Sequence, residues 1–328
     1  MKYVFSLIIA IFFCLSAIIS VAHAEEETSV IGVHILNTSE LNEAKELIKV
    51  EHTDTWQYVT IPFTLADLDK KTEWQEFFAT AQKNKIIPLV RLATSFEAGS
   101  WQIPSRKDVT EQLQFLSDLE WPTAKRHIIV FNEVNHSKEW GGRVNPSEYA
   151  EILRFTSEWA HTEHKNYVVL PAALDLAAPN GTQTKEAFAY LEELLTADAE
   201  ILSYLDGWNS HSYPNPGFSA SPLRTGKNSL RGYQYELAFL EKHGYTNVPV
   251  YITETGWEET RYTRQALTSY YEYALKYVWS DPRIKAVTPF VLKGAPGPFA
   301  GFSFVDSNGA PTRQYQALRA ALERIKKS

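Results

Sequence analysis

The chain has 328 residues, of which 44% are hydrophobic and 22% are charged. It is long enough and apolar enough to bury a full globular core, which excludes an intrinsically disordered chain. Lysine and arginine total 32 against 39 acidic residues, and this formal charge of −7 disfavours nucleic acid and anionic membranes as partners. The single cysteine, Cys14, excludes an intramolecular disulfide framework and any site that needs several thiolates.

The first 24 residues have the composition of a secretory signal. Lys2 precedes an apolar run over 4–21, and Ala22-His23-Ala24 follows as a small-x-small cleavage site. We predict cleavage after Ala24 and an extracytoplasmic location, either secreted, periplasmic or at the cell surface. The alternative is an uncleaved N-terminal anchor, because the run approaches the length of a membrane span, and we expect membrane contact only in that case.

From residue 25 onwards the sequence repeats one unit, a short β-branched apolar run followed by a polar loop and an amphipathic stretch. Eight runs have strand character and begin near Val30, Tyr58, Ile86, His127, Tyr167, Leu205, Val248 and Lys285. Helices are predicted over 41–50, 72–84, 108–119, 146–164, 185–195, 231–243, 262–278 and 315–325. The helix over 146–164 has the clearest start signal, since a proline at its first turn follows Asn145 as a capping residue.

Strands that alternate with single helices indicate parallel pairing with right-handed crossovers. Eight such units predict an α/β fold, a single (β/α)8 TIM barrel that forms one domain over 25–328. An open doubly wound sheet is the rival, but it normally begins with a glycine-rich turn, and 34–37 after the first strand contains no glycine. In a barrel, the functional residues are expected at the C-terminal strand ends.

Polar and aromatic side chains are concentrated at these predicted strand ends and in the loops that follow. Our candidate substrate-binding residues are His34, Arg91, Asn132, Trp140, Trp208, His211, Tyr213, Trp257 and Lys293. Glu133 and Glu254 stand out because each directly follows an apolar run, where an unpaired carboxylate is costly to bury. A single glutamate at such a place is typically a cap or an ion-pair partner, so the argument depends on the two together.

The spacing of Glu133 and Glu254 places them on the fourth and seventh strands, which face one another across the barrel mouth. Two carboxyl groups that converge there are what glycoside hydrolysis by double displacement needs. One carboxylate attacks the anomeric carbon, while the other protonates the leaving oxygen and later activates water. We therefore predict that both glutamates are catalytic.

Three segments carry a resemblance to a known superfamily, in this order along the chain: Asn132-Glu133, His211-Ser212-Tyr213 and Thr253-Glu254-Thr255-Gly256-Trp257. They resemble the retaining (β/α)8 glycoside hydrolases of clan A. Residues 131–149 are similar to bacterial cellulase-like and family 39-like members, and 301–315 are similar to the last barrel unit of the clan. The resemblance covers most of the chain after residue 24.

The resemblance implies a role for each matching residue. Glu133 is the general acid/base, Glu254 is the nucleophile, and Asn132 contacts the sugar 2-hydroxyl. Tyr213 holds Glu254 ionised and aimed, and His211 contacts the same subsite. Glu133 must give up a proton in the first step and take one in the second, so a bell-shaped pH profile is expected. No cofactor and no metal are expected.

Two departures from the clan pattern bear on substrate binding. Val134 stands where a proline usually follows the acid, a change that we expect the turn to tolerate. The eighth strand lacks the tryptophan that many members place at its end, so that Phe290, Phe299 or Trp257 substitutes for it, or the subsite holds a differently shaped unit. Lys293 at this strand end is unusual and is a candidate for binding a substituent or an anionic group.

Tryptophan rings near the mouth are candidates for stacking on the apolar faces of sugars. Trp140, Trp208 and Trp257 lie at or beside strand ends, and Trp101 lies in a long loop after the third strand. The alternative for each ring is core packing. Arg91 has two possible roles as well, orientation of the nucleophile or a structural ion pair.

Together these patterns predict a secreted, monomeric, retaining glycoside hydrolase that acts on a neutral β-linked oligo- or polysaccharide. One alternative is a catalytically weak barrel that binds polysaccharide, and another is a transglycosylase that uses the same two glutamates. The sugar, its linkage and the choice between endo and exo action stay open.

Overall fold

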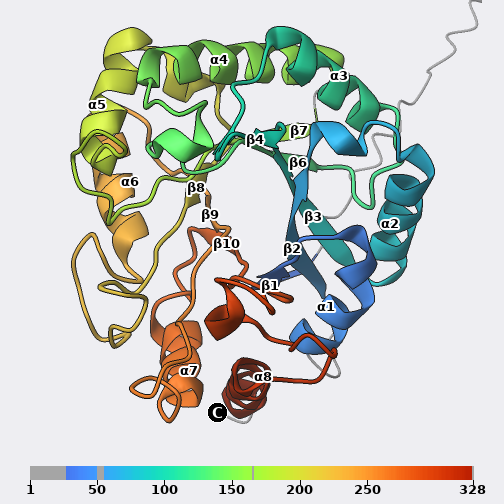
Figure 1. Ribbon diagram of the computed structural model, residues 1–328, viewed down its shortest axis with the longest axis vertical. Helices are drawn as coiled ribbons and strands as arrows, with labels where there is room; N and C mark the ends of the chain where they lie inside the picture. Colours follow the sequence, from blue (N-terminus) through green and yellow to red (C-terminus); the bar gives the residue numbers. More distant parts are fainter. Residues whose placement is uncertain (1–26, 50–54, 165, 327–328) are drawn as a thin grey trace, which may run out of the picture.

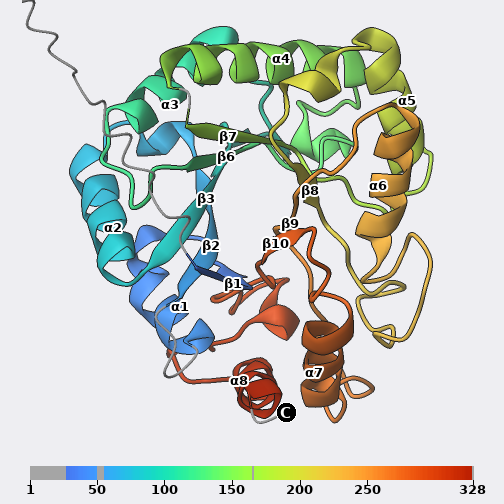
Figure 2. The same ribbon diagram turned by 180° about the vertical axis from the view of Figure 1, so that it is seen from behind.

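The computed structural model describes residues 27–49, 55–164 and 166–326, so the predicted signal segment lies outside the described residues. Eight parallel strands form one curved sheet in the order β7-β6-β3-β2-β1-β10-β9-β8, with helices around it (Figure 1). The view from behind shows the same outer ring of helices (Figure 2). The prediction of a (β/α)8 barrel is confirmed.

The strands lie close to their predicted starts. Their bounds are β1 Thr28–His34, β2 Trp56–Phe63, β3 Ile86–Leu92, β6 Arg126–Val130, β7 Tyr167–Pro171, β8 Trp208–Ser210, β9 Val250–Ile252 and β10 Ile284–Val287. The strands β8 and β9 begin a few residues later than predicted. Leu205, at the predicted start of β8, instead follows the short 3-10 helix Ile201–Tyr204 and packs in the core.

The eight main helices follow the predicted order. Their bounds are α1 Leu41–Ile48, α2 Lys71–Lys83, α3 Arg106–Ser117, α4 Pro146–Glu163, α5 Ala187–Ala197, α6 Gly232–Lys242, α7 Leu267–Tyr277 and α8 Arg313–Lys326. The predicted start of α4 is present, since the Asn145 side chain accepts a hydrogen bond from the Glu148 backbone N–H at 3.3 Å. No helix in the described ranges is both long and apolar enough to cross a membrane.

Asp206 links the two end strands of the sheet, β7 and β8, through its backbone and its side chain. The backbone N–H of Asp206 donates to the Val169 carbonyl at 3.1 Å, and the Asp206 carboxylate accepts from the Val169 N–H at 2.7 Å. Gly207 follows, and a Cβ there would stand 2.9 Å from the Leu170 side chain and 3.0 Å from the Pro249 carbonyl. The close approach of these strands therefore requires glycine.

Two apolar layers support the strand ends. Successive side chains along a strand point alternately into the barrel and out towards the helices. Ile129 therefore packs inside the barrel, whereas Ile128 and Val130 face the helices. The inner group consists of Tyr58, Ile87, Leu89, Ile129, Leu170, Tyr251 and Ala286. Packed layers on both sides hold the strands in place, which fixes the geometry of the residues at their ends.

The sequence patterns did not predict a short hairpin. The loop between β3 and α3 contains a two-stranded antiparallel hairpin, β4 Phe96–Glu97 and β5 Ser100–Trp101. Strands of two residues are too short to show an alternating pattern.

Candidate active site

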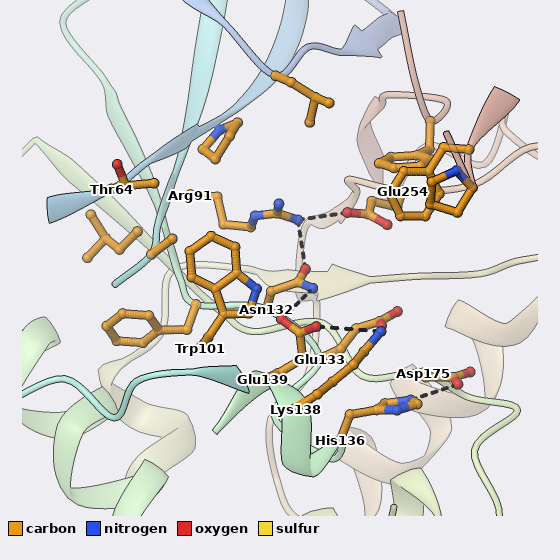
Figure 3. A pocket seen from close by; sticks show the side chains of 18 of the residues that line it. Thr64, Arg91, Trp101, Asn132, Glu133, His136, Lys138, Glu139, Asp175 and Glu254 are labelled. Atoms are coloured by element: carbon orange, nitrogen blue, oxygen red, sulfur yellow. Dashed lines mark hydrogen bonds and ion pairs between the residues drawn. The ribbon is translucent and has the colours of Figure 1, made fainter. Parts of the chain in front are cut away.

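The C-terminal strand ends open into a cavity of about 650 Å³. Five predicted site residues line it, namely Arg91, Asn132, Glu133, Tyr213 and Glu254. Figure 3 shows the Arg91 guanidinium between the Glu254 carboxylate and the Asn132 amide. The residues converge from β3, β6, β8 and β9 and from the loops after them, as expected for a barrel of this type.

Glu254 follows β9 and is held from several sides. Its Oε1 accepts a hydrogen bond from Arg91 at 2.7 Å, and its Oε2 accepts one from the Tyr213 hydroxyl at 3.2 Å. The Nδ1 atom of His34 lies 3.6 Å from Oε1. The predicted contact between Tyr213 and Glu254 is therefore present, and Arg91 takes the orienting position that was one of its two expected roles.

These neighbours decide the charge of Glu254. Burial alone would raise its pKa, but nearby positive charge outweighs burial and holds the pKa at about 2. Burial lowers the pKa of His34 to about 3, so this ring is neutral at pH 7. The positive charge therefore comes from His211 and Arg91, and Glu254 is ionised throughout the physiological range.

His211 connects the two glutamates. Its Nδ1 lies 2.9 Å from Glu133 Oε1 and 3.8 Å from Glu254 Oε2, while its Nε2 lies 3.3 Å from the Thr253 hydroxyl. That hydroxyl donates to the Asn209 side chain at 2.6 Å, so its oxygen is left to accept from Nε2. Burial opposes protonation of His211, but the two carboxylates more than offset it and raise its pKa.

Glu133 follows β6 in an unusual backbone conformation. Its φ is +29°, and Phe131 two residues earlier has a φ of +70°, both in the region that favours glycine. Such conformations cost about 1–3 kcal/mol each and cluster at functional sites. Carboxyl oxygens of Glu133 and Glu254 lie within 4.8 Å of each other. The two carboxylates thus face one another across a space that fits one reacting centre.

Asn132 is fixed at both ends of its amide. Its Oδ1 accepts from Arg91 at 2.7 Å, and its Nδ2 donates to Glu139 at 3.4 Å, which leaves a second Nδ2 hydrogen for a ligand. Burial, followed by the nearby Glu133 carboxylate, raises the pKa of Glu139. Sequence reasoning gave Glu139 no role, because it lies in a loop with no strand pattern to mark it.

A second pair that the sequence patterns missed also lines the cavity. His136 Nε2 lies 2.9 Å from the Asp175 carboxylate, and the two residues come from the loops after β6 and β7 (Figure 3). Burial opposes protonation of His136, but Asp175 and Glu133 raise its pKa. The pair adds a polar wall beside Glu133.

The side chains of Glu133, His211 and Glu254 are the one group among the described residues whose spacing could hold a metal ion, with candidate ligand atoms within 4.8 Å. Their charges fit that role poorly. Arg91 already pairs with Glu254 at 2.7 Å, and the raised pKa of His211 favours its cationic form, which is not a metal ligand. Each of these three side chains already has a hydrogen-bond partner in the protein.

Three predicted sugar contacts are wrong. Trp140, Trp208 and Trp257 are only 1%, 2% and 0% exposed, so no substrate can stack on them. Their indole N–H groups donate to protein acceptors, the carboxylates of Glu148 and Glu236 and the backbone carbonyl of Ala220. These rings pack between the barrel and its helices, and of the four tryptophans considered only Trp101 lines the cavity.

Three further assignments need correction. His34 and His211 are 0% and 2% exposed, so they contact the carboxylates rather than the substrate. Lys293 forms an ion pair with Glu43 at 2.7 Å, outside the lining of the cavity, which leaves it unsuited to bind an anionic substituent there. Of the three rings considered as substitutes for the missing tryptophan of the last strand, Phe290 and Phe299 line the cavity and Trp257 does not.

Comparisons with known proteins identify the family and the fold. The family model of the glycosyl hydrolase catalytic core matches residues 94–317. A search of curated proteins finds no match.

Solved structures share the fold at low sequence identity. A family 39 glycoside hydrolase from Bacteroides cellulosilyticus WH2 is 13% identical with a TM-score of 0.62, over 90% of this chain and 64% of its own. This chain therefore spans less than two thirds of that enzyme. An endo-β-1,4-glucanase from Xanthomonas axonopodis pv. citri is 13% identical with a TM-score of 0.56, over 90% of this chain and 99% of its own. An endo-β-1,3-glucanase of family GH128 from Pseudomonas viridiflava is 14% identical with a TM-score of 0.53, over 89% of this chain and 97% of its own.

Proposed function

Since the chain belongs to the glycosyl hydrolase catalytic core family, we propose that it is a retaining glycoside hydrolase that cleaves β-linked neutral oligo- or polysaccharides. The observation that carries the proposal is that one carboxyl oxygen of Glu133 lies within 4.8 Å of one carboxyl oxygen of Glu254. Retaining enzymes place these groups about 5–5.5 Å apart, whereas inverting enzymes leave about 6.5–9.5 Å for a water molecule.

In the first step, a carboxylate oxygen of Glu254 attacks the anomeric carbon and forms a covalent bond to the sugar. The bond to the leaving oxygen breaks, and Glu133 transfers its proton to that oxygen. Arg91 and Tyr213 hold the Glu254 carboxylate ionised and oriented for this attack. The free Nδ2 hydrogen of Asn132 is placed to bind the sugar 2-hydroxyl as positive charge develops on the ring.

In the second step, Glu133 takes a proton from water, which attacks the same anomeric carbon and releases Glu254 as a carboxylate. His211 Nδ1 lies 2.9 Å from Glu133 Oε1, so it holds the Glu133 carboxyl group in position through both steps. A sugar hydroxyl in place of water gives transglycosylation with the same residues.

The lining of the cavity supports a neutral substrate. Trp101, Phe290 and Phe299 offer apolar ring surface, while the chain carries a net charge of −7 that disfavours strongly anionic glycans. Two of the similar structures are glucanases, one acting on β-1,4 and one on β-1,3 linkages. We therefore propose β-glucans as the first substrates to test. Secretion after cleavage at Ala24 and a monomeric state belong to the same proposal.

The experiment is a polysaccharide panel assayed with the wild-type protein, Glu133→Gln and Glu254→Gln. We expect cleavage by the wild type alone, with the first product released in the β configuration when followed by NMR. An inverted first product would refute the double displacement. Normal turnover by either variant would show that the substituted glutamate is not catalytic. Binding without cleavage by the wild type would favour the alternative of a polysaccharide-binding barrel. Added acceptor sugars separate transglycosylation from hydrolysis.

A further inference from the structure

The hairpin β4–β5 carries two aromatic rings on one face. Phe96 and Trp101 are directly paired across the hairpin, so their side chains project on the same side. Their ring centroids are 5.5 Å apart at an interplanar angle of 70°. Trp101 lines the cavity and Phe96 is 57% exposed, so the aromatic surface continues from the cavity to its rim.

The hairpin is held in one shape by its turn. Ala98 and Gly99 have φ values of +51° and +85°, as the two-residue turns that match hairpin twist require. The backbone N–H of Gln102 donates to the Ser95 carbonyl at 2.9 Å and closes the base of the hairpin. The two rings are therefore presented by a short, closed element rather than by an open loop.

The hairpin is also tied to the catalytic residues. The Trp101 carbonyl accepts from the Gly141 N–H at 2.7 Å, in the loop that follows the 3-10 helix η3 Ser137–Glu139. Gly141 has a φ of +59°, and a Cβ there would stand 2.7 Å from the Ile103 side chain. Since Glu139 in η3 binds the Asn132 amide, Trp101 and Asn132 are anchored to the same short segment. Figure 3 shows the Trp101 indole beside Asn132 and Arg91.

A similar ring pair occurs on another rim of the cavity. Phe290 and Phe299, after β10, have ring centroids 5.0 Å apart, and Phe299 is 45% exposed. The strands β3 and β10, whose loops carry these two pairs, are separated in the sheet by β2 and β1. Both rings of this second pair line the cavity, so exposed aromatic rings stand on two sides of it, an arrangement suited to a chain that extends beyond the cavity.

We propose that the hairpin β4–β5 is a binding platform for the sugar chain of the substrate, in which Trp101 stacks on a sugar inside the cavity and Phe96 on the next sugar at the rim. This inference rests on the proposed function and adds to it a preference for long, neutral β-linked chains. Apolar sugar faces and aromatic rings supply the contact. The charged residue of the hairpin, Glu97, is paired with Ser100 and projects from the opposite face.

The test compares Phe96→Ala with the wild-type protein on neutral β-linked oligosaccharides of increasing length, drawn from the polysaccharide that the wild type cleaves. We expect kcat/KM to fall about fivefold on the longest oligosaccharides, through KM, because a lost aromatic contact costs this much. The shortest oligosaccharide that the wild type cleaves should be unaffected. Phe96→Tyr, which keeps a ring, should restore the wild-type values. Trp101→Ala should lower kcat/KM at every length.

Tyr277→Ala is the matched control, because Tyr277 on α7 is 56% exposed and lies in the outer ring of helices. It should leave the dependence on length unchanged. The platform is refuted if Phe96→Ala behaves as the wild type at all lengths, or if it lowers kcat/KM equally at all of them. A wild-type protein that cleaves none of the substrates would refute the proposed function and the platform with it.

Discussion

The two glutamates that we propose as catalytic occupy contrasting surroundings, although both follow buried strands. The Glu254 side chain is 11% exposed and is held by Arg91 and Tyr213, whereas the Glu133 side chain is 19% exposed and meets one close partner, His211. One carboxylate is surrounded by groups that fix its charge, and the other is left open to the cavity. These environments suit the same residue type to the two different roles that we propose.

The difference has a physical reason. A nucleophile must stay ionised and aimed, which needs fixed hydrogen-bond donors and positive charge around it. An acid/base must exchange its proton with the leaving oxygen and with water, which needs access to the cavity. Glu133 pairs with His211 at 2.9 Å, whereas Arg91 and Tyr213 both donate hydrogen bonds to Glu254.

The largest effect is expected from Glu254→Gln, which removes the nucleophile. We expect kcat to fall about 10⁴-fold or more, because no other group can form the covalent intermediate. Azide added to Glu254→Ala should restore turnover and give the α-glycosyl azide, since azide attacks from the side that Glu254 vacates. Retention of a tenth of the wild-type activity in Glu254→Gln would contradict the assignment.

Glu133→Ala should lower kcat/KM about 10²–10⁴-fold on natural sugars, since general acid catalysis is worth this much. The loss should be small on an aryl glycoside whose leaving group needs no proton. Here azide should give the β-glycosyl azide, because it replaces water in the second step. The same azide anomer from both alanine variants would show that the two roles are not divided between these glutamates.

Arg91→Met tests what holds the nucleophile ionised. The pKa of Glu254 is depressed to about 2 in part by Arg91, so it should rise when the guanidinium is removed. The acidic limb of the kcat/KM profile should then move to higher pH, with a loss of about 10- to 100-fold at neutral pH. Arg91→Lys keeps the charge and should shift the limb less. An unmoved acidic limb in Arg91→Met would mean that the arginine has no influence on Glu254.

Tyr213→Phe removes one hydrogen bond to Glu254 and keeps the ring. The bond spans 3.2 Å, and we expect kcat to fall about fivefold to tenfold with KM nearly unchanged. Thermal unfolding of the variant should match that of the wild type. A rise in KM alone would assign Tyr213 to substrate binding instead.

Lys293→Ala should have the smallest effect, within about twofold of the wild-type kcat/KM, because Lys293 pairs with Glu43 near the surface. Glu43→Ala is the matched control and should behave alike. If Lys293→Ala lowered kcat/KM on any glycan and Glu43→Ala did not, Lys293 would have the role in substrate binding that the structure argues against.

The sequence predicted the barrel and the two glutamates for one reason. Apolar runs of strand length mark where each strand ends, and the barrel brings those ends together. The helix start at Asn145 was likewise visible, because capping depends on local residues.

The sequence patterns did not predict which way the side chains in the loops point. Trp140 follows Glu133 by seven residues, yet its ring packs against Phe131 and Tyr149, because the loop turns it towards the helices. Glu139 beside it points into the cavity. Which of two neighbours in a loop faces the ligand depends on tertiary packing, and a loop has no period from which to infer it. The hairpin that carries Phe96 was missed for the same reason.

The most direct test of the division between the glutamates is to trap the intermediate. A 2-deoxy-2-fluoro glycoside with a reactive leaving group, built on the sugar that the wild type cleaves, should form a stable covalent adduct. Peptide mapping by mass spectrometry should locate the adduct on Glu254. An adduct on Glu133, or a reactive substrate that turns over without any adduct, would contradict the account.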